Sequence, residues 1–266
     1  MNVLWVLAAP ERASLTGALH DEGMRMLREL GHECRVSDLY AMKWKAVLDR
    51  EDFPEATESP LIVTAASQRA YTEGTLSPDI AAEQEKLAWA DAVVFSFPLW
   101  WYGMPAILKG WFDRVFVQGY AYDVPDPTTP GRSLRYGEGN LAGKRALVLL
   151  SCGSRESAVG PRGISGQLEE VLFPLLHGTL WYTGMSVLPP VCIYSADEMN
   201  PGQFQAAAGT VRAALAGLAT TNPLPYRYQN HGDYVRGVLR PDLLPGRTGL
   251  AIHSIAEPAV EERRHG

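Results

Sequence analysis

Residues 92–122 of the chain read AVVFSFPLWWYGMPAILKGWFDRVFVQGYAY, and three features of this stretch decide the fold. The run Ala92–Phe97 is continuously apolar and rich in β-branched and aromatic side chains, which predicts a central parallel strand covered on both faces. After Pro105, apolar residues recur at helical spacing and predict a helix. The loop Leu99–Met104 therefore follows the carboxyl end of a strand, where open α/β sheets place their ligands.

This loop contains three consecutive aromatic residues, Trp100, Trp101 and Tyr102. Packing in the core is the simplest interpretation of an aromatic side chain, and it fits Trp111 and Phe112 because they lie on the apolar stripe of the helix. Three neighbouring aromatic residues between a proline and a glycine cannot all point into one core. We therefore predict that at least one of them lines a cavity for a flat ligand.

The rest of the chain predicts five strands that alternate with helices. The expected strands are residues 3–8, 33–39, 92–97, 145–151 and 186–194, and the expected helices are residues 15–30, 77–89, 105–116, 167–181 and 201–219. This alternation indicates an α/β fold with a doubly wound parallel sheet and right-handed crossovers, in the strand order 2-1-3-4-5. We expect residues 1–220 to form this domain. Residues 221–266 lack the periodicity and predict an irregular C-terminal extension laid over another surface.

Composition excludes several classes of function. A chain of 266 residues with 46% hydrophobic content can bury a large core. A net charge of −6 without a basic run argues against a protein that binds nucleic acid or a membrane surface. Cys34, Cys152 and Cys192 are odd in number and widely spaced, so we expect neither a disulfide framework nor a metal site. The sequence shows no export signal or membrane-spanning run, and we expect a cytoplasmic location.

A second candidate ligand-binding segment follows the first strand. Ser14, Leu15 and Thr16 stand at the start of a helix, where free backbone amides and the helix dipole attract an anion, and Arg12 can add donors. N-capping by Ser14 alone explains the same pattern equally well. The aromatic loop two elements later favours a phosphate cradle. The segment lacks G-x-G-x-x-G, so a tightly held NAD is not indicated.

Small polar residues follow the fourth strand at the same edge of the predicted sheet. They are Ser151, Cys152, Gly153 and Ser154, and their size would let the backbone approach a flat ring closely. A nucleophilic role for Cys152 is the alternative. No histidine lies near it in the sequence, and we therefore favour the contact with a ring.

Taken together, these residues resemble the flavodoxin-like NAD(P)H:quinone oxidoreductases of the DT-diaphorase type over residues 2–220. The longest matching stretches are SDLYAM at 37–42, LSPDI at 76–80, FPL at 97–99 and PAILKGWF at 105–112. The resemblance implies a homodimer that binds FAD, with FMN the less favoured flavin, and passes a hydride from NAD(P)H through the flavin to a quinone. Both subunits of such a dimer contribute to each site, so we expect residues 221–266 to pack at the dimer interface.

The resemblance also implies roles for individual residues. Those implied for cofactor binding are Ser14, Leu15 and Thr16 on the pyrophosphate, and Pro98, Leu99, Trp100, Trp101, Tyr102, Ser151, Cys152, Gly153 and Ser154 around the isoalloxazine ring. Those implied for the substrate pocket are Trp101, Tyr102, Tyr122 and Tyr182. Tyr122 and the backbone amide of Gly153 are the candidate catalytic groups, the amide because it can stabilise negative charge on the reduced ring.

One departure from the family bears on the chemistry. The family uses a tyrosine and a histidine after the fourth strand to relieve charge on the reduced flavin, and the aligned positions here hold Val159 and Ser165. Neither side chain can carry the same proton relay. The candidate replacements are Tyr122, Tyr182 and Arg162, of which Tyr122 is favoured because it matches a pocket position.

Three functions are consistent with these features. The leading one is a flavin-dependent NAD(P)H oxidoreductase that reduces a quinone or a similar flat, electron-poor small molecule. A second is a pathway-specific flavin reductase acting on one aromatic biosynthetic intermediate. A third is a flavin-binding regulatory or electron-carrier protein, which low turnover with every acceptor despite full flavin occupancy would favour.

Overall fold

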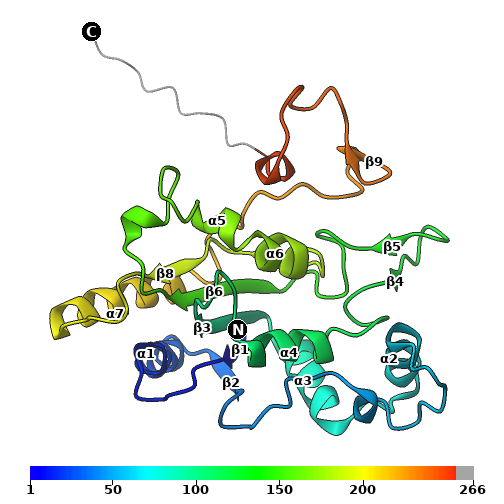
Figure 1. Ribbon diagram of the computed structural model, residues 1–266, viewed down its shortest axis with the longest axis horizontal. Helices are drawn as coiled ribbons and strands as arrows, with labels where there is room; N and C mark the ends of the chain where they lie inside the picture. Colours follow the sequence, from blue (N-terminus) through cyan, green and yellow to red (C-terminus); the bar gives the residue numbers. More distant parts are fainter. Residues whose placement is uncertain (256–266) are drawn as a thin grey trace.

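The computed structural model describes residues 1–255 and shows one central sheet with helices on both faces (Figure 1). The strands lie in the order β2, β1, β3, β6 and β7, and β8 also pairs with β6. Their bounds are Asn2–Leu7 for β1, Glu33–Asp38 for β2, Ala92–Pro98 for β3, Arg145–Ser151 for β6, Ser186–Val187 for β7 and Val191–Ile193 for β8. All pairings in this sheet are parallel. The predicted doubly wound α/β fold and the order 2-1-3-4-5 are therefore confirmed.

Successive side chains of a strand pack into two separate hydrophobic cores, one on each face of the sheet. The main helices are α1 Leu15–Glu29, α2 Val63–Glu73, α3 Pro78–Trp89, α4 Ala106–Val115 and α7 Pro201–Ala216. In β1, Trp5 packs in the core shared with α1 and α7, whereas the next residue, Val6, packs in the core shared with α3 and α4. Because successive strand side chains point to opposite faces, a continuous apolar run such as β3 is buried on both sides.

Two expected elements differ in detail from the structure. The fifth strand is split into β7 and β8 by Pro189 and Pro190, because proline has no amide hydrogen for the ladder. The expected helix 167–181 is built from three short pieces, with Pro174 near the middle. These are α5 Leu168–Val171, α6 Phe173–Leu175 and a π-helical turn, η3, at Leu176–Trp181.

Short elements fill the connections. They are the 3-10 turns η1 Arg50–Asp52, η2 Glu156–Ala158 and η4 Leu250–His253, and the two-residue strands β4 Val124–Pro125, β5 Ser133–Leu134, β9 Tyr234–Val235 and β10 Val238–Leu239. No helix among residues 1–255 is both long enough and apolar enough to cross a bilayer.

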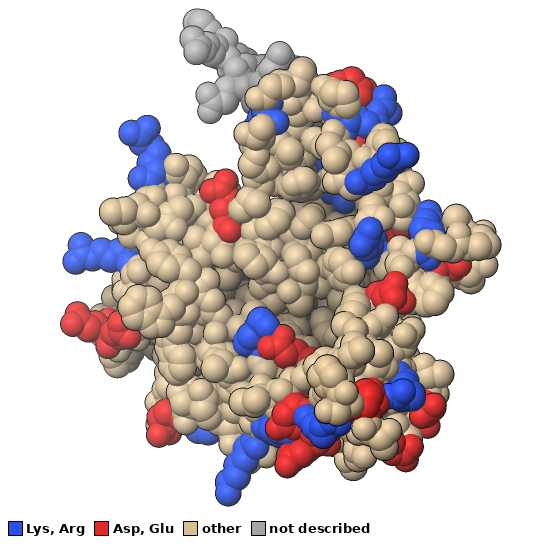
Figure 2. All heavy atoms as spheres, turned by 45° about the vertical axis from the view of Figure 1, so that its right-hand side comes forward, with Lys and Arg blue, Asp and Glu red and all other residues tan. Residues whose placement is uncertain are grey.

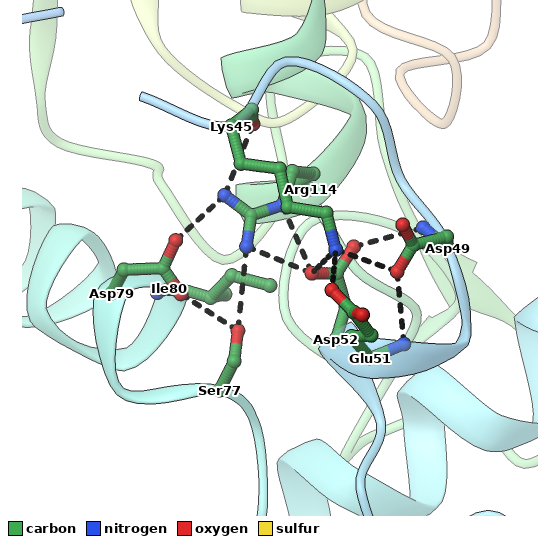
Figure 3. A network of polar contacts seen from close by, with 8 residues as sticks. All are labelled: Lys45, Asp49, Glu51, Asp52, Ser77, Asp79, Ile80 and Arg114. Carbon is green, nitrogen blue, oxygen red and sulfur yellow. Dashed lines mark hydrogen bonds and ion pairs between the residues drawn. The ribbon is translucent and has the colours of Figure 1, made fainter. Parts of the chain in front are cut away.

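The buried side chain of Arg114 ties α4 to the loops beside it (Figure 3). It is only 1% exposed and donates to Asp52 Oδ1 at 2.8 and 3.1 Å and to Asp79 Oδ2 at 2.7 Å. Its guanidinium carbon also lies 4.5 Å from the ring centroid of Trp44. The network therefore holds the C-terminal end of α4 against the segments that carry Asp52 and Asp79.

The C-terminal extension packs on its own domain as far as residue 255. Leu224 N donates to the carbonyl of Val187 at 2.7 Å, and Tyr226 is buried against the ring of His177 with centroids 5.0 Å apart. Tyr228 meets Trp181 in an edge-to-face contact at 4.7 Å. Residues 221–255 thus cover α6 and η3, and the remainder of the predicted extension, residues 256–266, lies outside the described residues.

Candidate functional site

Three predicted ligand-binding segments meet at the carboxyl edge of the sheet. Pro98 at the end of β3 pairs in register with Ser151 at the end of β6, and Leu99 N donates to the Ser151 carbonyl at 2.8 Å. The hydroxyl of Thr16, at the start of α1, lies 2.9 Å from the Ser151 hydroxyl. The segments after β1, β3 and β6 are therefore in direct contact, as the shared edge of a parallel sheet requires.

The aromatic loop is a tight turn with a strained backbone. Trp100 and Gly103 exchange two backbone hydrogen bonds, each 2.9 Å long. The two residues between them, Trp101 and Tyr102, have positive φ angles of 48° and 59°, in the left-handed region that non-glycine residues seldom adopt. Such strain persists where the surrounding structure enforces it, commonly at ligand sites. The turn leaves Trp101 98% exposed, so its indole ring is free to cover a ligand.

The loops after β3 and β6 border one cavity of about 340 Å³. Its walls are Leu99, Trp101 and Tyr102 from the first loop, Cys152, Gly153 and Ser154 from the second, and Val159, Ser165 and Val171 from the segment beyond. This volume lies within the range of about 300–1,000 Å³ typical of small-molecule pockets. The walls are mainly apolar, with a few hydroxyl groups, which suits a flat aromatic ring that carries polar edge atoms.

The loop after β6 lies close to the side chain of Asp197. A Cβ atom on Gly153 would meet the Asp197 carboxylate, which is exposed and would have to move aside. Cys152 is buried, and its amide donates to the Ile193 carbonyl at 2.9 Å. On the neighbouring strand, burial raises the pKa of the Cys192 thiol to about 12. Cys192 therefore stays protonated at neutral pH and is a poor nucleophile.

The segment at the start of α1 combines capping with free amides. The Ser14 hydroxyl accepts from Gly17 N at 3.3 Å, so the N-capping interpretation applies to this side chain. The amides of Leu15 and Thr16 belong to the first helical turn, which lacks intrahelical carbonyl partners, and they can still receive an anion. Arg12 forms an ion pair with Asp21, so its charge is already partly neutralised.

The two pocket tyrosines expected from the family lie outside this cavity. Tyr122 lines a separate cavity of about 390 Å³ beside α2 and α4, together with Phe112, and burial raises the pKa of its hydroxyl. Tyr182 packs edge-to-face on Tyr136, with centroids 5.0 Å apart. Within a single chain, therefore, the structure does not bring Tyr122 or Tyr182 to the loops that follow β3 and β6.

The two substituted relay positions do lie in the cavity wall, and one of them has an unexpected partner. Val159 and Ser165 both line the cavity, and the Tyr102 hydroxyl donates to Ser165 Oγ at 3.3 Å. Arg162 is exposed and is not among the lining residues. The Tyr102–Ser165 contact was not predicted from the sequence, in which Tyr102 was assigned to the cofactor and the substrate pocket without a partner for its hydroxyl.

A third cavity, of about 310 Å³, lies between η3 and the C-terminal extension and includes His177. The ring of His177 is buried and stacked on Phe173, with centroids 4.5 Å apart. Burial lowers the pKa of His177 from 6.5 to about 4. The imidazole is therefore neutral in the folded protein at neutral pH.

The low pKa of His177 predicts that acid weakens the fold. Between about pH 6.5 and pH 4 the unfolded chain binds a proton at His177 that the folded chain does not bind, so stability falls as the pH falls. We expect this residue to lower the free energy of unfolding by about 1–2 kcal/mol between pH 7 and pH 5. Urea unfolding at both pH values measures the loss. His177→Gln should show a shallower pH dependence, and an unchanged slope would contradict the assignment.

Comparisons with known proteins place this chain in a family. A family model described as a flavodoxin-like fold matches residues 1–215, and the chain belongs to that family. The chain is 46% identical over 235 residues to the ribosyldihydronicotinamide dehydrogenase-like protein traD of Penicillium crustosum, covering 88% of this chain and 87% of the relative. It is 38% identical over 202 residues to NAD(P)H dehydrogenase [quinone] 1 of Cavia porcellus, covering 75% and 70%.

One solved structure agrees over nearly the whole chain. It belongs to a Klebsiella pneumoniae protein whose description proposes a quinone reductase, and it superimposes with a TM-score of 0.93 at 46% identity. The match covers 96% of this chain and 100% of the other. The similarity therefore extends beyond the flavodoxin-like core into the C-terminal extension.

Proposed function

We propose that this protein is a flavin-dependent NAD(P)H oxidoreductase that reduces a quinone or a similar flat, electron-poor acceptor. The observation that carries the proposal is the cavity of about 340 Å³ between the loops after β3 and β6. The residue before the second of these loops, Ser151, contacts Thr16 at the start of α1. A relative at 38% identity is named NAD(P)H dehydrogenase [quinone] 1, and one at 46% identity is named a ribosyldihydronicotinamide dehydrogenase-like protein. The flavin would supply the hydride chemistry, and the protein would supply binding, orientation and electrostatics.

The residues around the cavity fit a flavin. Pro98–Tyr102 and Ser151–Ser154 form the two sides against which an isoalloxazine ring would lie. The amides of Leu15 and Thr16, with the Thr16 hydroxyl, would hold the pyrophosphate at the start of α1. The amide of Gly153 would stabilise negative charge at the edge of the ring. We favour FAD over FMN because the family resemblance implies FAD.

We also propose a homodimer. Tyr122 and Tyr182 lie away from the cavity of their own chain, so a second copy is needed if they are to line the acceptor pocket. The cavity that contains Tyr122 has the exposed residue Val63 in its wall, and the neighbouring Ile62 is 57% exposed. Exposed apolar side chains of this kind are typical of a surface that packs against another subunit. A molar mass from light scattering equal to that of one chain would exclude this arrangement.

The charge distribution agrees with a small-molecule substrate. On the face drawn in Figure 2, Lys and Arg side chains are interspersed with Asp and Glu, mostly toward the edges, and one such pair of opposite charge lies beside the hollowed middle. That face offers no extended positive surface to a phosphate backbone. We propose a cytoplasmic location, because the three free cysteines Cys34, Cys152 and Cys192 fit a reducing compartment.

Replacing Trp101 by alanine should weaken binding of the flavin or of the acceptor by roughly two- to tenfold, since stacking is worth about 0.5–1.5 kcal/mol beyond buried area. Because Trp101 is 98% exposed, the substitution should leave folding stability unchanged. Fluorescence titration with FAD and steady-state kinetics with a quinone measure the two affinities. Trp101→Phe is the matched control and should retain most of the effect of the aromatic ring. Unchanged affinities in Trp101→Ala would remove this residue from the site.

The test of the function is turnover of flavin-loaded protein with NADPH or NADH and a set of quinones, nitroaromatics and azo compounds. We expect quinone reduction that depends on the flavin. High turnover confined to one polycyclic acceptor would favour the pathway-specific reductase. Full flavin occupancy with negligible turnover of every acceptor would contradict the proposal and favour an electron-carrier or regulatory role.

A further inference from the structure

Two hydroxyl groups from distant parts of the chain meet in the wall of the ring cavity. The Tyr102 hydroxyl donates a hydrogen bond to Ser165 Oγ at 3.3 Å, although 63 residues separate them. Both residues line the cavity, and their neighbours there include the apolar side chains of Val159 and Val171. A polar pair in such a setting is the natural place for a ligand atom that needs a hydrogen bond.

The aromatic turn aims Tyr102 at this partner. The backbone of Tyr102 has a φ of 59°, and the preceding Trp101 also has a positive φ, while the paired hydrogen bonds between Trp100 and Gly103 close the turn. This backbone conformation is unfavourable for a tyrosine, and it persists because the closed turn enforces it. As a result, the two side chains differ in their contacts: Trp101 is 98% exposed, whereas Tyr102, at 60% exposed, places its hydroxyl on Ser165.

The segment that carries Ser165 is held equally firmly. Ser165 N donates to the Ala158 carbonyl at 3.0 Å, and Gly166 N donates to the Gly163 carbonyl at 3.1 Å. A Cβ atom on Gly163 would collide with the Ala158 carbonyl, so the chain folds back on itself too tightly for any other residue. The Ser165 side chain therefore stands on a fixed backbone at the rim of the cavity.

The direction of the hydrogen bond leaves one proton free. Tyr102 donates to Ser165 Oγ, so the hydrogen of the serine hydroxyl remains available for a further acceptor. Hydrogen bonds in a chain strengthen one another, which makes Ser165 a better donor than an isolated serine. A hydrogen bond to a charged group is also stronger than one to a neutral group.

We propose that Ser165 donates this hydrogen bond to the oxygen or nitrogen edge of the flavin ring on which negative charge collects when the ring is reduced, and that Tyr102 is the residue that positions Ser165 for it. The proposal rests on the proposed function. The two hydroxyl groups would then stabilise the reduced ring more strongly than the oxidised ring. No covalent bond changes on the protein, and no proton leaves Tyr102 or Ser165.

The test is the midpoint potential of the bound flavin, measured by anaerobic spectroelectrochemical titration of wild type, Tyr102→Phe, Ser165→Ala and the double variant. Loss of the donor should lower the ratio of reduced-flavin to oxidised-flavin affinity about tenfold in Ser165→Ala, because a hydrogen bond to a charged group is stronger than one to a neutral group. Tenfold corresponds to a potential about 30 mV more negative for a two-electron couple. Tyr102→Phe should give a smaller shift in the same direction.

Two comparisons distinguish a positioning role of Tyr102 from a general disturbance of the site. The double variant should have the potential of Ser165→Ala, because Tyr102→Phe keeps the aromatic ring and the Tyr102 hydroxyl acts only through Ser165. Ser165→Thr keeps the hydroxyl and should restore most of the wild-type potential. Additive shifts, or a wild-type potential in Ser165→Ala, would overturn the inference while leaving the proposed function intact. A wild-type protein that binds no flavin would overturn both.

Discussion

Replacing Arg114 by methionine should lower the free energy of unfolding by about 3–5 kcal/mol, the usual cost of removing one partner from a buried ion pair. The side chains of Arg114 and Asp52 are each only 1% exposed, so the substitution leaves the Asp52 carboxylate buried without its main cation. Asp79 and the Lys45 carbonyl also lose a donor. Since domains are typically stable by about 5–15 kcal/mol, a loss of this size is a large share of the total.

Urea unfolding of the flavin-free proteins measures the change without a contribution from cofactor binding. Arg114→Lys keeps the charge but not the forked geometry that contacts both Asp52 and Asp79, and it should show an intermediate loss. Combining Arg114→Met with Asp52→Leu should recover stability relative to Arg114→Met alone, because the uncompensated charge is gone. A loss below about 1 kcal/mol in Arg114→Met would show that the pair contributes no more than a surface ion pair.

The second large effect concerns the rate at which NAD(P)H reduces the bound flavin. The family resemblance implies a tyrosine and histidine where this chain has Val159 and Ser165, and both positions lie in the cavity wall. General acid–base assistance is typically worth about 10²–10⁴-fold, so introducing Val159→Tyr together with Ser165→His should speed flavin reduction by about 10²-fold or more. The imidazole would also keep a hydrogen-bond donor at position 165.

Stopped-flow absorbance under anaerobic conditions measures this rate separately from reoxidation by the acceptor. Val159→Phe with Ser165→Asn is the matched control, because it has similar bulk and cannot transfer protons in the same way. We expect flavin reduction to limit turnover in the wild type. Reduction far faster than turnover in the wild type would contradict that expectation and show that the pair is dispensable here.

The sheet could be predicted because its signals are local. Ala92–Phe97 is apolar at every position, as a strand buried on both faces must be, and the alternation of strands with helices fixes a parallel sheet. Helix α2 was missed for an equally local reason. Its buried residues are Ala66, Ser67 and Ala70, which are too small to give a hydrophobic stripe. Pro189 and Pro190 did signal an interruption, which the analysis of the fifth strand passed over.

Only those contacts of the candidate site that follow from the sheet topology could be predicted from the sequence. Segments after parallel strands share one edge, so the contact of Thr16 with Ser151 follows from the fold alone. The contact between Tyr102 and Ser165 depends on a left-handed turn and on a tightly folded segment, neither of which has a periodic signal. Tyr122 matched a pocket position by resemblance, yet in one chain it lines a different cavity, because its place depends on tertiary packing beyond sequence spacing.

The central claim is that the cavity between the loops after β3 and β6 holds a flavin. The most direct measurement is the visible absorption spectrum of the purified protein, followed by denaturation and determination of the mass and amount of the released cofactor. The account predicts a yellow protein that releases FAD in a one-to-one ratio to the chain. Release of FMN would correct the choice of flavin and leave the site in place. A colourless protein that takes up neither FAD nor FMN when they are added would contradict the account.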